Sequence, residues 1–186
     1  MTHEPSVIEI LRARLRFRLF GKAAYRAYAN RLPIRGDEAV LDFGCGLGGI
    51  AYYVAARLPA GSLICHDRAG QWLCACRRTL RRRRNVVYLD TDADLSTLAE
   101  ESFGLVYCHS VFNGAPSSEF ALALPQLARL LKPGGLIGYC DTLARAEFAA
   151  AITSLARQSG LFKVDSRVTD VPFVGSTIEN IYARPR

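Results

Sequence analysis

The segment Val40-Leu41-Asp42-Phe43-Gly44-Cys45-Gly46-Leu47-Gly48-Gly49 decides the fold of this chain. Its apolar lead-in predicts a buried strand, and the glycines that follow predict a sharp turn into a helix. Because glycine has no Cβ, a ligand can come close to the main chain of such a loop. The segment therefore predicts a nucleotide-like ligand at the end of a strand.

Strands and helices alternate after this segment, which is typical of a doubly wound α/β fold. The predicted strands span 39–43, 62–66, 86–89, 105–108, 136–140, 162–168 and 177–183. The predicted helices span 48–57, 71–81, 95–99, 119–131 and 145–159. The loop between the last two strands is too short for a crossover helix, so these strands should pair antiparallel.

Residues 1–33 precede this pattern, and we predict that they form a helical cap segment before a domain over 34–186. Helices are expected over 7–20 and 20–31, and Leu32-Pro33 should end the second one. No apolar run reaches the roughly 18 residues of a membrane-spanning helix. The N-terminus also lacks the apolar core of a secretory signal, so we expect a cytoplasmic protein.

The net charge of +7 is concentrated in two places. Residues 1–36 hold eight Arg or Lys against Glu4 and Glu9, which gives +6, and Arg77, Arg78 and 81–84 form a second basic cluster. Such clusters favour a membrane surface, nucleic acid or an acidic metabolite, although charge runs often only face water.

The chain has six cysteines, and most of them lie in apolar segments where a free thiol behaves as a small hydrophobe. Cys74-x-Cys76 together with Cys65-His66 is compatible with a metal site. No second pair at zinc-finger spacing follows, however, so we predict no metal.

Three carboxylates indicate which ligand the glycine loop binds. Asp42 lies just before the turn, where it disfavours a pyrophosphate and suits a ligand with a free amino group. Asp67 ends the second strand, where an acid can accept both hydroxyls of a ribose. Asp92 follows the third strand and can accept from an adenine amino group. Together these residues describe an adenosyl ligand without a diphosphate.

The chain resembles the class I S-adenosylmethionine-dependent methyltransferases, of the compact small-molecule type. The resemblance covers about residues 34–186. It rests on the 40–48 loop, Asp67, Asp92-Ala93, the 102–106 stretch that runs into the fourth strand, and Arg129-Leu-Leu-Lys-Pro-Gly-Gly135. It implies a Rossmann-like, mostly parallel seven-stranded sheet with an antiparallel last strand. The implied cofactor is S-adenosyl-L-methionine.

The resemblance also implies site residues. The backbone of Gly44, Gly46 and Gly48 would face the methionine part of the cofactor, with Asp42 near its ammonium. Asp67 would hold the ribose. Arg68, Asp92 and Ala93 would lie beside the adenine. Cys108 and His109 would lie near the sulfonium, and His109 is the candidate general base because its pKa suits proton removal near neutrality.

The methyl acceptor stays open at this point. No Asn-Pro-Pro-aromatic tetrad follows the fourth strand, only Ser110-Val-Phe-Asn-Gly114, which argues against methylation of base or amide nitrogens. We predict a small-molecule acceptor. The alternatives are a lipid or quinone-like acceptor reached through the basic N-terminus, an RNA bound by the 81–84 cluster, and a non-catalytic cofactor-binding module, which Gly104 in place of the usual Asp favours.

Overall fold

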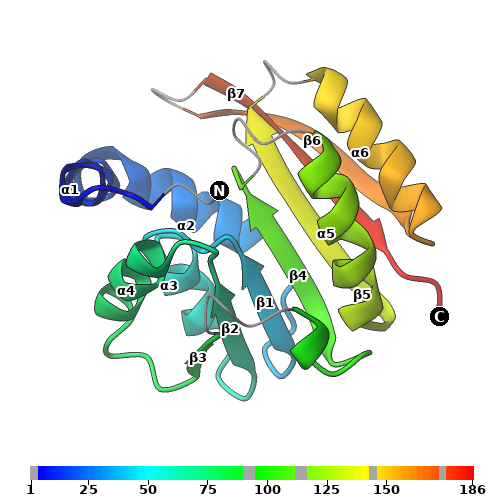
Figure 1. Ribbon diagram of the computed structural model, residues 1–186, viewed down its shortest axis with the longest axis horizontal. Helices are drawn as coiled ribbons and strands as arrows, with labels where there is room; N and C mark the ends of the chain where they lie inside the picture. Colours follow the sequence, from blue (N-terminus) through cyan, green and yellow to red (C-terminus); the bar gives the residue numbers. More distant parts are fainter. Residues whose placement is uncertain (1–3, 90–94, 112–116, 143–145, 172–174) are drawn as a thin grey trace. The chain divides into compact units, whose positions relative to one another are not determined.

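A computed structural model describes residues 4–89, 95–111, 117–142, 146–171 and 175–186 (Figure 1). In these ranges seven strands form one sheet in the order β3-β2-β1-β4-β5-β7-β6. The strands are β1 (Ala39–Phe43), β2 (Ser62–His66), β3 (Val86–Tyr88), β4 (Phe103–His109), β5 (Leu131–Thr142), β6 (Phe162–Val171) and β7 (Gly175–Ala183). The α-helices are α1 (Val7–Arg16), α2 (Lys22–Arg31), α3 (Ala51–Val54), α4 (Gly70–Thr79), α5 (Ser117–Leu130) and α6 (Ala146–Gln158).

The first of two compact units spans Met1–Asp94. Its strands β1, β2 and β3 are parallel, with Leu41 opposite Ile64 and Leu63 opposite Val86. Crossover helices connect them, since parallel neighbours cannot be joined by a tight turn. Strands β1 and β2 have the bounds that the apolar pattern predicts.

The N-terminal helices of this unit run on without a break. Ser6 caps α1 by accepting from the Glu9 amide, while the Glu9 carboxylate accepts from the Ser6 amide. The predicted boundary at residue 20 falls in a π-helical turn over Phe17–Gly21 rather than between two separate helices. Leu32 is extended, so α2 ends at Arg31 and Leu32-Pro33 stops it as predicted.

The second unit spans Leu95–Arg186 and contains β4 to β7. Strand β4 pairs parallel with β5, and β7 pairs antiparallel with both β5 and β6. Helix α6 ends at Gln158, and Gly160 just beyond it has a φ of 77°, the left-handed value favoured after a helix C-terminus. The predicted antiparallel hairpin and the α/β class are therefore confirmed.

Strand β5 begins earlier than the sequence predicts. We expected a turn at Lys132-Pro-Gly-Gly135 and a strand from residue 136. Instead β5 starts at Leu131, and its register moves from Phe103–Leu131 to Leu105–Leu136. The residues between Leu131 and Leu136 therefore form a bulge inside the strand, with Gly134 at a φ of 75°.

Across the described residues, none of the helices combines the length and the apolar character that crossing a bilayer requires.

Candidate functional site

The glycine loop is fastened to the end of β2 by two backbone hydrogen bonds. The amides of Gly44 and Cys45 both donate to the His66 carbonyl, at 2.8 and 2.9 Å. Gly44, Gly46 and Gly48 have φ values of 81°, 50° and 79°, in the left-handed region where a side chain is disfavoured. The loop therefore depends on glycine at three positions.

Asp67 joins this loop to the start of α4. Its Oδ2 accepts from the Gly46 amide at 2.8 Å, and its Oδ1 accepts from the Ala69 amide at 3.0 Å. Burial raises the pKa of Asp67, although the two amides oppose that shift. The structure thus brings together two of the predicted cofactor residues, Gly46 and Asp67, which are 21 positions apart.

Asp42 and Arg68, two further predicted residues of this unit, differ in exposure. Asp42 is buried in β1, where it lies in register with Cys65. Arg68 is exposed and follows Asp67 directly. Asp92 and Ala93 fall outside the described residues, so their predicted adenine contacts stay predictions.

The glycines of the loop have different surroundings. A Cβ added at Gly46 would meet no atom within 4 Å, so this position is open. One added at Gly48 would lie 2.7 Å from the Cys76 Sγ, and one at Gly49 would lie 2.8 Å from the Tyr25 ring. Only Gly46 among these three leaves space for a ligand, because the other two are in contact with protein atoms.

The N-terminal segment packs against this loop. Phe17 and Tyr25 stack with ring centroids 5.8 Å apart, and both rings lie close to Gly49. Upstream, the Glu4 carboxylate accepts from the amides of Gly70 and Gln71 at 2.8 and 3.1 Å. A carboxylate at this position complements the N-terminus of α4. The N-terminal segment therefore contacts both the glycine loop and the N-terminus of α4.

His66 is a buried polar residue that the sequence reasoning did not select. Its ring stacks on Phe43 at a centroid distance of 5.2 Å. Among the described residues, no atom hydrogen-bonds its Nδ1. Burial and the nearby Arg68 charge lower the pKa of His66 to about 4, so the ring is neutral at neutral pH. The one sequence signal that could have indicated a role for His66 is its position directly before Asp67.

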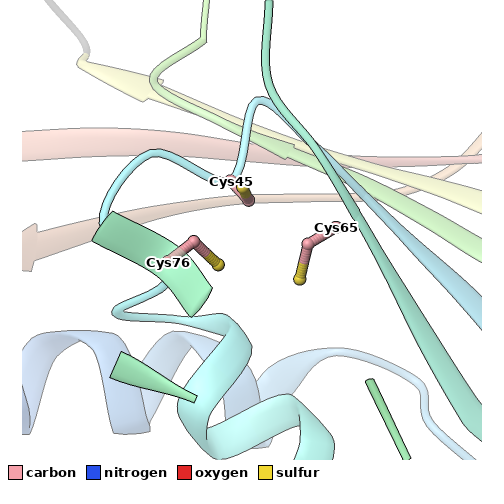
Figure 2. A group of neighbouring side chains, drawn as sticks. All are labelled: Cys45, Cys65 and Cys76. Carbon is pink, nitrogen blue, oxygen red and sulfur yellow. The ribbon is translucent and has the colours of Figure 1, made fainter. Parts of the chain in front are cut away.

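Three cysteines converge behind the loop, as Figure 2 shows. The Sγ atoms of Cys45, Cys65 and Cys76 all lie within 4.8 Å of one another, and all three residues are buried. The thiols of Cys45 and Cys65 lower the pKa of Cys76 by hydrogen bonding to its sulfur. Cys74, which the sequence pattern paired with Cys76, is exposed and does not join them.

The second unit holds the predicted residues Cys108 and His109 at the end of β4. Cys108 is buried and His109 is half-buried. Ser110 follows with a φ of 54°, an uncommon value for a residue with a side chain, and its amide donates to the Cys140 carbonyl at 2.9 Å. The chain therefore turns sharply directly after the candidate base.

Comparisons with known proteins agree with these features. A family model described as "Methyltransferase domain" matches residues 40–135. A trans-aconitate 2-methyltransferase of Methylobacterium radiotolerans is 32% identical over 107 residues, covering 58% of this chain and 39% of that protein. A phthiotriol/phenolphthiotriol dimycocerosates methyltransferase of Mycobacterium ulcerans is 32% identical over 137 residues, covering 71% and 47%. The chain thus spans less than half the length of these relatives.

Among solved structures, a SAM-dependent methyltransferase from Aquifex aeolicus superimposes with a TM-score of 0.70 at 18% identity. The match covers 90% of this chain and 91% of that one. At this identity the likeness concerns the fold.

Proposed function

We propose a reaction for this chain, which belongs to the class I S-adenosylmethionine-dependent methyltransferases. It transfers a methyl group from S-adenosyl-L-methionine to a small-molecule acceptor. The hydrogen bond from the Gly46 amide to Asp67 carries this proposal. It places an acceptor-only carboxylate beside an open glycine backbone, and a ribose with two hydroxyls suits such a carboxylate.

Two residues of the first unit support binding of the adenosyl cofactor. Gly46 leaves room for the methionine part, and each Asp67 oxygen keeps a second lone pair that can accept from a ribose hydroxyl while the Gly46 and Ala69 amides stay bonded. We also propose the predicted contacts of Asp42, Gly44, Arg68, Asp92, Ala93 and Cys108. The bound cofactor supplies an activated methyl group on a sulfonium.

The protein's part in the transfer is to align the acceptor and to exclude water. We propose that residues 1–33 form the cap that excludes water, which the contacts of Phe17, Tyr25 and Glu4 support. His109 is proposed as the general base for an acceptor that carries a proton, since a neutral imidazole can accept one near neutrality.

Turnover of methyl-labelled cofactor against a panel of small carboxylic acids, phenols and amines tests the proposal. We expect label transfer to at least one acceptor, with slower transfer by His109→Gln when the acceptor must lose a proton. Cofactor binding without transfer to any member would favour a non-catalytic binding module. Absence of cofactor binding would contradict the proposal altogether.

The exposed face of α1 favours a second candidate, a lipid or quinone-like acceptor at a membrane surface. Large apolar side chains of α1 and the turn after it are 57–77% exposed, namely Val7, Ile8, Leu11, Leu15, Leu19 and Phe20. At about 100° per residue, the four in α1 share one helix face. Arg12 and Arg14 border that face on either side, as is usual in interfacial helices.

Flotation with anionic vesicles tests this alternative. We expect the chain to float with such vesicles, and the Leu11→Asp/Leu15→Asp variant to stay behind because charges replace its exposed apolar face. An Arg81→Ser/Arg82→Ser variant serves as the control, since it removes charge elsewhere. Equal flotation of all three would remove α1 as the membrane contact.

A further inference from the structure

Three thiols from three different elements share one buried space behind the glycine loop (Figure 2). Cys45 belongs to the loop after β1, Cys65 lies within β2, and Cys76 lies within α4. Cys65 and Cys76 are 0% exposed and Cys45 is 8% exposed. The three side chains are therefore held by packed elements and largely shielded from solvent.

The sulfur positions suit a metal ion without large movement. Metal–thiolate bonds of about 2.3 Å place the three sulfurs of a planar site about 4 Å apart. The Sγ atoms of Cys45, Cys65 and Cys76 already lie within 4.8 Å of one another, so rotation about χ1 and small shifts can close the remaining gap. A central ion would then contact all three sulfurs at once.

We propose that Cys45, Cys65 and Cys76 form a three-coordinate thiolate site for Cu(I). Within the described ranges, no fourth His, Cys, Asp or Glu belongs to this group, whereas structural zinc sites are almost always tetrahedral with four ligands. A soft monovalent ion accepts three sulfur ligands, and thiolates select Cu(I) over harder cations.

The glycine loop leaves room for the thiol cluster. Binding of Cu(I) would release the thiol protons as the sulfur–metal bonds form. Gly48 leaves the space that Cys76 needs, because a Cβ there would lie 2.7 Å from the Cys76 Sγ. Position 48 therefore requires glycine for the packing of the thiol cluster as well as for the backbone of the loop.

The site also adjoins the proposed cofactor loop, since Cys45 is part of that loop and Cys76 touches Gly48. We expect Cu(I) and the cofactor to change each other's affinity by the same factor. This expectation rests on the proposed function, whereas Cu(I) binding itself does not. A chain that binds Cu(I) but no cofactor would overturn only the proposed function.

Anaerobic titration of the reduced full chain with Cu(I), against a chromophoric chelator, tests the site. We expect one Cu(I) per chain in the wild type and in Cys74→Ser and Cys140→Ser. Cys76→Ser and Cys45→Ser should bind at least about 100-fold more weakly, since loss of even an outer-shell partner costs roughly 10- to 100-fold. Equal affinity in all four variants, or no binding by the wild type, would show that the thiols only pack in the core.

X-ray absorption at the copper edge of the wild-type complex needs no variant to fold. Three sulfur neighbours at about 2.3 Å support the site. A shell of two sulfurs, or one that includes nitrogen or oxygen, overturns it. Tighter binding of Zn(II) than of Cu(I) would also overturn it, because it would require a fourth ligand.

Discussion

Replacement of Asp67 by alanine is expected to weaken S-adenosylmethionine binding by at least about 100-fold, measured by titration calorimetry. A ribose would give this carboxylate two charge-assisted hydrogen bonds, each worth about 1.5–3 kcal/mol, and about 1.4 kcal/mol is tenfold in affinity. Alanine removes both, and it also removes the acceptor of the Gly46 amide that fixes the loop.

Two control variants distinguish loss of the ribose contact from a changed conformation of the glycine loop. Asp37→Ala removes an exposed acid of the same unit and should leave affinity unchanged. Asp67→Asn keeps the shape of the side chain and one of its two amide acceptors, so it should weaken binding but lower the thermal melting temperature less than Asp67→Ala does. Unchanged affinity of Asp67→Ala would contradict the ribose assignment.

The Asp67 carboxylate also predicts how the affinity for S-adenosylmethionine changes with pH. Burial raises the pKa of Asp67, and the ionised form is the one that accepts from the ribose. Affinity should therefore be full above that pKa and fall as the pH decreases through it. In the Asp67→Asn variant this decline should be absent.

The local parts of the fold could be predicted from sequence. Strands over 39–43 and 62–66 follow from apolar runs that end at a glycine turn and at Asp67, because both signals act over a few residues. The bulge after Leu131 could not be predicted. Lys132-Pro133-Gly134-Gly135 satisfies the rules for a turn, and it lies inside β5 because Leu131 and Leu136 on either side both pair with β4.

The candidate site likewise has one part that the sequence predicts and one part that it does not. Asp67 was predicted because it is an acid at the end of the second strand, and Gly46 because the glycine loop resembles that of the family. The cysteine cluster was missed because sequence spacing pairs Cys76 with Cys74, whereas the helix turns these two side chains in different directions. Which thiols meet depends on how α4 packs against β2 and the loop, and no short motif records that packing.

Gly48→Ala is expected to lose mainly stability, whereas Gly46→Ala is expected to lose mainly cofactor binding. Both positions have positive φ, so each substitution costs about 1–2 kcal/mol of left-handed strain. At Gly48 the new Cβ would also lie 2.7 Å from the Cys76 Sγ, and overpacking of this kind adds about 1–3 kcal/mol. Gly48→Ala should therefore lower the free energy of unfolding by about 2–5 kcal/mol in urea titration.

Gly46→Ala should instead retain most of the stability and lose cofactor binding, because its Cβ enters the open space that we propose the cofactor fills. Calorimetry at a temperature where both variants are folded separates the two effects. Adding Cys76→Ala to Gly48→Ala should recover the overpacking part of the loss and leave the strain, since it removes the sulfur that the new Cβ meets. If Gly46→Ala were the less stable variant, or if Cys76→Ala gave no recovery, the contact between Gly48 and the thiol cluster would not be what constrains this end of the loop.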